Sequence, residues 1–310
     1  MTDKEIIGWL LEGDPSIRWQ VYRDLLDADK MTILQERMKI STEGWGSRLL
    51  GFQDGNGMWS GKLYSPKWTS TTYTLLLLRR IGLDPDNKQA QTGSVVLLNN
   101  GFYEDGGINF WKSFKHSETC VTGIILSILA YFNIPDPRLV SMAEHLLNEQ
   151  MKDGGWNCQK CNGATHGSFH TTISVLEGLH EYLEKYSEHR QDIIRSRDRA
   201  IEFLLEHRLY RSHRTGQVVK DKMTRFHFPP RWYYDVLRIL DYFQHAGIGR
   251  DARMQDGIGL VDKKRKPDGR WILPVGHGGK VFFEFETAGK PSRWNTLRAL
   301  RVLKWWNAGE

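Results

Sequence analysis

The sequence of 310 residues predicts an all-helical protein, an α/α toroid in which inner and outer helices form a double ring of about five to six helix pairs. Three observations predict it. A glycine-rich turn recurs along the chain, the segments that follow the turns are apolar on several faces, and the segments between them are amphipathic. A helix that is apolar all round must be buried, whereas an amphipathic helix covers a core. A double ring buries both sets correctly.

The composition is that of a soluble globular protein, with 40% hydrophobic and 26% charged residues. The net charge of +6 is concentrated at residues 190–220, where acidic residues interrupt the basic ones. Such a mixed face is typical of a solvated helix, so we expect no nucleic-acid partner. The longest nearly apolar run, residues 121–134, is too short for a transmembrane segment. Three cysteines argue against a disulfide scaffold and predict a cytoplasmic location. The sequence leaves the oligomeric state open.

The chain is expected to form one domain over residues 1–310. Residues 1–44 predict short helices, and Gly13, Asp14 and Pro15 separate two of them in the manner of a HEAT-type pair. Residues 45–310 carry the repeats.

A unit recurs with a spacing of roughly 50 to 60 residues, and its turn has four recognisable copies. Asp-Gly and Gly-Gly pairs supply the positive φ at which a helix can end abruptly. A glutamine can bond backbone groups at a neighbouring helix end, and a tryptophan can be buried between adjacent units. A further unit near residues 211–220 keeps little beyond Gly216. The copies are residues 53–59 (QDGNGMW), 104–107 (EDGG), 150–156 (QMKDGGW) and 267–271 (PDGRW).

The predicted inner helices begin after polar segments rich in Ser and Thr, which are good helix N-caps. Residues 75–78 and 124–129 show the apolar character of these helices. The predicted outer helices, such as residues 136–150 and 192–208, carry one apolar stripe. An open solenoid is the alternative, but it would be amphipathic in both layers. The polar segments, called lead-ins below, are residues 68–72, 116–120, 168–172, 231–235 and 292–296.

The turns of the form Gln-x-x-Asp-Gly-x-Trp resemble the repeats of squalene and hopene cyclases and the related repeats of protein prenyltransferase β-subunits. The resemblance extends from about residue 45 to residue 306. It implies a toroid with a central cavity. It does not imply one function, because the same fold contains cyclases, transferases and non-catalytic domains.

In such a toroid the lead-ins are expected at one mouth of the cavity, where helix N-termini favour anions such as diphosphate. Aromatic walls with a few charges suit an isoprenoid chain that has a charged head. Aromatic residues at repeat junctions can equally be core residues. The candidate cavity residues are Trp68, Trp111, His116, Phe169, Trp232 and Trp294.

The acidic motifs of terpene cyclases, Asp-x-Asp-Asp and Asp-Asp-x-x-Asp, do not occur in this sequence. The candidate catalytic residues are therefore charged residues of the lead-ins: Glu118, Arg231, Asp235 and Arg293. Together with Glu284 and Glu286, Asp235 could support acid–base chemistry on a sugar or a terpene. Such charges also occur as buried structural ion pairs.

Zinc is the one cofactor that the residues suggest. The resemblance to prenyltransferases implies a zinc site from Glu118, Cys120 and His170, although the family has Asp where this chain has Glu118. The spacing of Cys158, Cys161, His166 and His170 suggests instead a closed structural zinc site within one loop. A third interpretation has Cys120 as a buried apolar residue and the other two cysteines as free thiols.

Three functions remain open. The first is binding of, or catalysis on, an isoprenoid or similarly apolar small molecule. The second is a non-catalytic toroid that binds a partner or ligand. The third is an α/α-barrel enzyme that acts on carbohydrate.

Overall fold

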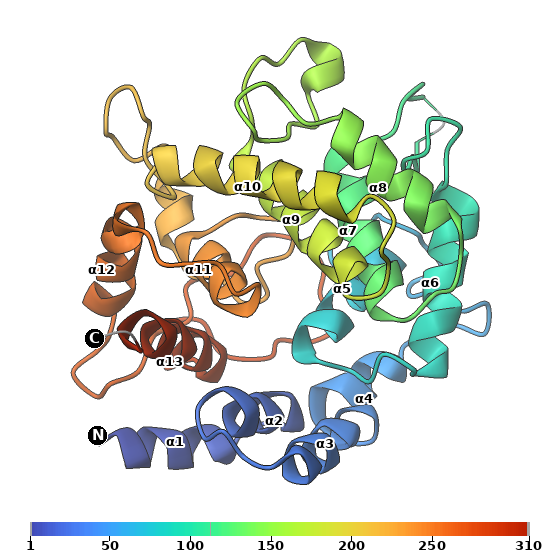
Figure 1. The fold of residues 1–310 in the computed structure, drawn as a ribbon. Helices are drawn as coiled ribbons and strands as arrows, with labels where there is room; N and C mark the ends of the chain where they lie inside the picture. The colour runs from blue at the N-terminus through green and yellow to red at the C-terminus, as the bar shows by residue number, and fades with distance from the viewer. Residues whose placement is uncertain (1, 112, 309–310) are drawn as a thin grey trace. The chain divides into compact units, whose positions relative to one another are not determined.

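The computed structural model describes residues 2–111 and 113–308. Within these residues every regular element is an α-helix or a short 3-10 helix, and β-type pairing is limited to isolated bridges such as Gln53 with Trp59. The predicted all-helical class is confirmed (Figure 1). No helix in the described ranges has both the length and the apolar character needed to span a membrane.

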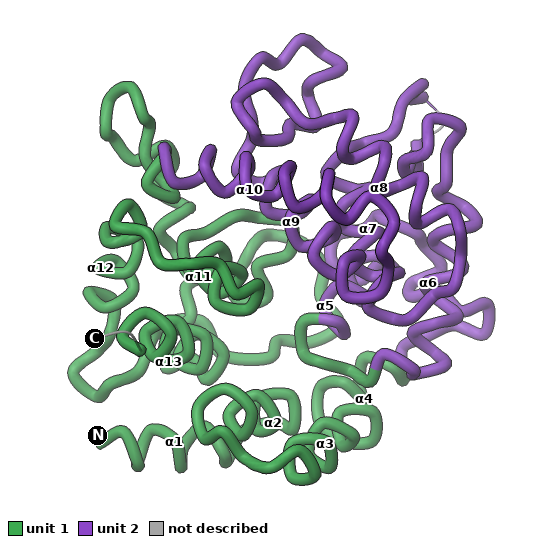
Figure 2. Tube along the Cα trace, viewed as in Figure 1, with its two compact units in different colours: residues 1–51, 80–84, 207–310 green, residues 52–79, 85–206 purple. Residues whose placement is uncertain are grey.

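The chain divides into two compact units (Figure 2). Unit 1 comprises residues 1–51, 80–84 and 207–310, and unit 2 comprises residues 52–79 and 85–206. The organisation of residues 1–310 as one domain stays a prediction.

Unit 2 shows the predicted alternation of buried and amphipathic helices. Helix α7 (Thr119–Tyr131) is buried along nearly its whole length, as its apolar sequence requires. Helix α8 (Arg138–Asn148) buries only one stripe, which contains Leu139, Met142, Ala143 and Leu146. The other helices of this unit are α5 (Thr71–Ile81, whose last two residues belong to unit 1), α6 (Lys88–Gly101), α9 (Phe169–Leu183) and α10 (Arg190–Glu206).

Unit 1 begins with the predicted pair of short helices. Asp14 caps the second helix by accepting a hydrogen bond from the Ser16 amide. Its buried charges are paired. Arg301 contacts Asp24 at 2.9 Å and Asp241 at 2.7 Å. The helices are α1 (Asp3–Leu11), α2 (Pro15–Asp24), α3 (Lys30–Met38), α4 (Gly44–Leu50), α11 (Val236–His245), α12 (Gln255–Lys263) and α13 (Arg293–Asn307).

One hydrogen bond recurs in all four copies of the turn. A backbone amide of the turn donates to the hydroxyl of a threonine in the first turn of the following inner helix. All four threonines are completely buried, so each hydroxyl satisfies an amide that water cannot reach. The pairs are Trp59 with Thr71 (3.0 Å), Ile108 with Thr122 (2.9 Å), Trp156 with Thr172 (3.0 Å) and Trp271 with Thr296 (3.1 Å).

The predicted roles of the turn glycines and the burial of the turn tryptophans are confirmed, whereas the glutamines bond a neighbouring helix at its beginning for Gln53 and within it for Gln150. Gly57, Gly106, Gly154 and Gly269 all have φ between 81° and 89°, where a side chain would be strained. The side-chain amide of Gln150 donates to the carbonyl oxygens of Gly154 and of Ser196 on α10, both at 2.7 Å. Gln53 does the same with Gly57 and with Gln89 of α6. The turn tryptophans Trp59, Trp156 and Trp271 are buried.

The substitution Thr172→Val keeps the shape of the side chain but leaves the buried Trp156 amide without its acceptor. We expect the free energy of unfolding to fall by about 1–3 kcal/mol, measured by chemical denaturation. Thr165→Val, at an exposed position of the same unit, should change it by no more than about 0.5 kcal/mol. Equal effects of the two substitutions would contradict this role of the hydroxyl.

Candidate functional site

Two glycines bring the inner helices α7 and α9 of unit 2 into close contact. A Cβ atom on Gly123 would lie 2.8 Å from the carbonyl oxygen of Ser174. A Cβ atom on Gly178 would lie 2.4 Å from the carbonyl oxygen of Gly123. Only glycine permits this approach, which places the beginnings of the two helices side by side. Both lead-ins of these helices carry candidate site residues.

Cys120 and Cys158, the thiol pair, meet at the beginnings of these helices. The sulfur of Cys158 lies 3.3 Å from the backbone nitrogen of Cys120, which donates to it, and 3.3 Å from the hydroxyl oxygen of Thr171. Neither cysteine is in a disulfide, and both are half-buried.

The contacts of the thiol pair shift the pKa values of the two cysteines in opposite directions. The hydrogen bond to Cys158, together with burial, raises the pKa of Cys120 well above its usual value. The hydrogen bond from Cys120 lowers the pKa of Cys158, and Thr171 acts in the same direction against the effect of burial. The proton therefore stays on Cys120, and negative charge is favoured on Cys158.

Cys161 and His116 form a second sulfur contact in the same unit. The sulfur of Cys161 lies 3.1 Å from His116 Nε2 and 3.5 Å from the carbonyl oxygen of Cys158. The His116 ring stacks on Phe114 with a centroid separation of 5.7 Å. His116 belonged to the predicted cavity residues, and its contact with Cys161 was not predicted.

The structure combines the two predicted zinc sets differently from either prediction. It joins one cysteine of each set, Cys120 and Cys158, whereas His166 is exposed and lies 3.9 Å from Asp153. His170 is the second residue of α9. Within residues 2–111 and 113–308, no group of three or more His, Cys, Asp or Glu side chains is arranged to hold a metal ion. Zinc binding stays a prediction.

Glu118 is the carboxyl group nearest to the beginning of α7, where it occupies the N-cap position without a capping hydrogen bond. Its Oε2 atom is buried and has no hydrogen-bond partner among the described residues. Burial raises the pKa of Glu118, and the positive charges of His116 and Lys67 oppose the shift. This carboxyl therefore keeps its proton more readily than an exposed glutamate would.

Unit 2 has an aromatic pocket of about 410 Å³ that Tyr64 and Trp111 help to line. The Tyr64 ring is 5.0 Å from the ring of Trp111, and Trp111 is 5.8 Å from Phe114, the ring on which His116 stacks. Burial and the charges of Cys120 and Glu118 raise the pKa of Tyr64, so its phenol lies within electrostatic reach of both. The pocket is lined by Met58, Gly61, Lys62, Leu63, Tyr64, Ser65, Val96, Asn100, Phe110 and Trp111.

Sequence reasoning identified Trp111 but missed Tyr64, Leu63 and Phe110. The missed residues lie between a recurring turn and the next inner helix, so an alignment of the repeats that extended beyond the turns could have indicated them. Two other predicted cavity residues of unit 2 pack in the interior. Trp68 is buried with its ring 4.7 Å from that of Tyr73, and Phe169 is buried 5.6 Å from Phe203.

The predicted catalytic residues of unit 1 have structural contacts. Asp235 caps α11 by accepting from the Arg238 amide at 2.8 Å and is only 1% exposed. Burial raises its pKa, and Arg298 and Arg238 oppose the shift. Arg293 donates to the carbonyl oxygen of Trp9 at 2.9 Å. Arg231 is buried with φ of 57°.

The remaining candidates of unit 1 also lie in packed surroundings. Trp294 stacks on Phe228 at 4.0 Å, and Trp232 stacks on Tyr233 at 3.9 Å. Glu286 accepts a hydrogen bond from the Arg293 amide at 2.6 Å, so it caps the beginning of α13.

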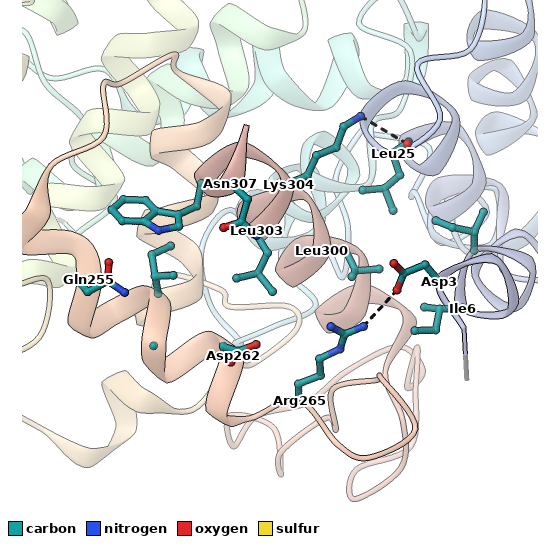
Figure 3. Close-up of a pocket in the computed structure, with 14 residues that line it drawn as sticks. Asp3, Ile6, Leu25, Gln255, Asp262, Arg265, Leu300, Leu303, Lys304 and Asn307 are labelled. Atoms are coloured by element: carbon teal, nitrogen blue, oxygen red, sulfur yellow. Dashed lines mark hydrogen bonds and ion pairs between the residues drawn. The ribbon is translucent and has the colours of Figure 1, made fainter. Parts of the chain in front are cut away.

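Unit 1 also has a groove of about 680 Å³ along α1, α12 and α13 (Figure 3). Its wall contains Ile6, Leu300 and Leu303, and an ion pair of 3.4 Å joins Asp3 to Arg265 across it. This groove was not predicted from the sequence.

No known protein family and no curated protein matches the sequence. Solved structures similar to the chain include the apo type II terpene cyclase MstE from Scytonema, with 16% identity, a TM-score of 0.45 and coverage of 96% of this chain and 89% of that one. An arginine-to-alanine variant of MstE in complex with geranylgeranyl dihydroxybenzoate has 17% identity and a TM-score of 0.46, with 94% and 87% of the two chains covered. The likeness concerns the fold and not the site.

The substitution Gly123→Ala should force α7 and α9 apart, because the new Cβ would meet backbone atoms that cannot yield. We expect a loss of about 1–3 kcal/mol of unfolding free energy, measured by urea denaturation. The matched change Gly259→Ala, on α12, meets nothing within 4 Å. It should instead stabilise the chain by about 0.5–1 kcal/mol. A harmless Gly123→Ala would contradict the close contact.

The raised pKa of Glu118 predicts a pH-dependent stability. The contribution of its neutral form is complete below about pH 4.5, the ordinary value, and is lost as the pH rises through the higher pKa of the folded chain. The glutamine of Glu118→Gln stays neutral at every pH. As the pH rises through the pKa of Glu118, the free energy of unfolding of the variant should therefore increase relative to that of the parent, and the difference should then stay constant. Denaturation at a series of pH values measures the difference.

Glu144→Gln, which replaces an exposed carboxyl on α8, serves as the control and should follow the parent protein at every pH. A Glu118→Gln profile parallel to that of the parent would show that burial of Glu118 does not influence its ionisation.

Proposed function

We propose that unit 2 binds an apolar small molecule of the isoprenoid class on its aromatic pocket, with Glu118 at the chemically active end. One observation carries this proposal. Tyr64 lines the pocket with Trp111 and is close enough to Glu118 for that charge to raise its pKa, and the buried Oε2 atom of Glu118 has no partner among the described residues.

The pocket has the size and lining that such a ligand requires. Ligand sites are typically concave and mainly apolar, with volumes of about 300–1,000 Å³, and this one has about 410 Å³. Each methylene group removed from water contributes about 0.8 kcal/mol. The Lys67 ammonium lies 6.0 Å from the Tyr64 ring and 5.8 Å from the Trp68 ring. Lys62, which lines the pocket itself, supplies positive charge that would favour an anionic head group.

Glu118 could supply the chemistry of an enzyme at this site. A carboxylic acid whose pKa is raised by burial can donate a proton to a bound alkene. The carbocation that results would be stabilised by neighbouring ring faces, because the face of an aromatic ring attracts a cation. Tyr64 is the candidate ring for this stabilisation, because the charge of Glu118 raises the pKa of its phenol.

The alternatives from the sequence have less support. A carbohydrate enzyme would need Asp235 and Glu286 for acid–base work, whereas both carboxyl groups cap helices. A non-catalytic protein would have the same pocket, so ligand turnover distinguishes it from an enzyme.

The substitution Trp111→Ala should weaken the binding of farnesol and geranylgeraniol about tenfold or more, because it removes one aromatic wall of the pocket. Titration followed by tryptophan fluorescence and native mass spectrometry measures the affinity. Trp305→Ala removes a tryptophan of α13 that does not line the pocket and should leave binding unchanged. Failure of both alcohols to bind the parent protein, or equal binding by both variants, would overturn the proposal.

A further inference from the structure

The sulfur of Cys158 lies at the beginnings of two helices at once. The amide of Cys120, the second residue of α7, donates to this sulfur, and so can the hydroxyl of Thr171, the third residue of α9. The beginning of a helix carries partial positive charge, which favours the thiolate over the thiol. Two helix beginnings act here on one sulfur atom.

The neighbouring thiol of Cys120 distinguishes this arrangement from an isolated reactive cysteine. Cys120 is in direct contact with Cys158, because its backbone amide donates to the Cys158 sulfur at 3.3 Å. Glu118 and Tyr64 are the other titratable groups that act on the thiol pair, and the negative charge of Glu118 opposes ionisation of both sulfurs. The amide of Cys120 and the hydroxyl of Thr171, each 3.3 Å from the Cys158 sulfur, favour its ionisation against this effect.

We propose that Cys158 is a nucleophilic thiol that reacts with hydroperoxides, and that Cys120 is the resolving thiol that completes a reversible disulfide. The proposal rests on the contacts of the thiol pair and does not depend on an isoprenoid ligand. In this proposal Cys120 forms a redox pair with Cys158 and is not a ligand of a zinc site with Glu118 and His170.

The reaction has two steps that balance. The Cys158 thiolate attacks one oxygen of the hydroperoxide, so that an S–O bond forms, the O–O bond breaks, and the departing oxygen leaves as an alcohol, or as water from hydrogen peroxide, after taking a proton. Cys120 then loses its proton and attacks the Cys158 sulfur, an S–S bond forms, and the sulfenic oxygen leaves as water. Two thiols lose two electrons and two protons in total, and the hydroperoxide is reduced.

The disulfide would join the beginning of α7 to the loop that precedes α9. This loop, residues 157–168, also contains Cys161, which is exposed and whose sulfur lies 3.1 Å from His116 Nε2. Cys161 therefore provides a matched control, because it is a thiol of the same loop without contacts to two helix beginnings.

The test uses the full chain, reduced, freed of reductant and treated with hydrogen peroxide. Peptide mass spectrometry without reduction should find Cys120 linked to Cys158, and the number of free thiols should fall from three to one. Cys158→Ser should abolish the reaction. Cys120→Ser should stop it at a sulfenic acid on Cys158, which dimedone captures. Cys161→Ser should leave the disulfide intact.

Thr171→Val removes the hydroxyl next to Cys158 and should slow sulfenic acid formation about tenfold. Circular dichroism and thermal denaturation of each variant show whether it is folded. Exclusive linkage of Cys158 to Cys161, or equal oxidation rates of the three cysteines, would overturn the proposal. Stoichiometric zinc that is retained by the parent and lost in both Cys120→Ser and Cys158→Ser would overturn it as well. Ligand binding by unit 2 is measured separately, so its failure would leave this result unaffected.

Discussion

The hydrogen bond from a turn amide to a buried threonine hydroxyl is the constraint on which the repeats depend. In each repeat a threonine accepts a hydrogen bond from the backbone amide of the turn tryptophan, or of Ile108 at the equivalent position in the second copy. The threonines are Thr71, Thr122, Thr172 and Thr296. An unsatisfied buried amide costs about 1–3 kcal/mol, so the start of each inner helix is fixed relative to the turn before it. The second copy shows that the threonine matters more than the tryptophan, because Ile108 replaces tryptophan there and keeps the bond.

This constraint also fixes where chemical groups can lie in unit 2. Glu118 and Cys120 precede Thr122 by a few residues, and Thr171 directly precedes Thr172, so the threonines hold these groups in place. Gly123 and Gly178 then bring the two helices together. Towards the other end, Arg79 of α5 contacts Glu177 at 3.0 Å and Glu181 at 2.6 Å, both on α9. Satisfied charges stabilise that end, whereas the end with the lead-ins retains an unpartnered carboxyl oxygen.

Unit 1 uses the same turn but a different kind of interior. Arg301 and Arg298 both contact Asp241, and Arg301 also reaches Asp24. Burial would raise the pKa of Asp241, yet the two arginines outweigh it and hold that pKa below its usual value. A buried ion pair of this kind requires every partner, because removal of one leaves an uncompensated charge. These four charged residues of unit 1 therefore stabilise its packed interior.

The sequence by itself determined the helical class, the turns and the alternation of buried with amphipathic helices, because periodicity and glycine conformation are local properties. It also identified all three cysteines, Glu118 and Trp111 as candidates. Only the tertiary structure decided the partners. Cys120 and Cys158 are 38 residues apart, and their contact depends on how closely α7 approaches α9. The same holds for Tyr64 beside Trp111 and for Cys161 beside His116. Spacing along the chain fixes which residues share a helix face, but the distance between two helices is set by packing at positions such as Gly123.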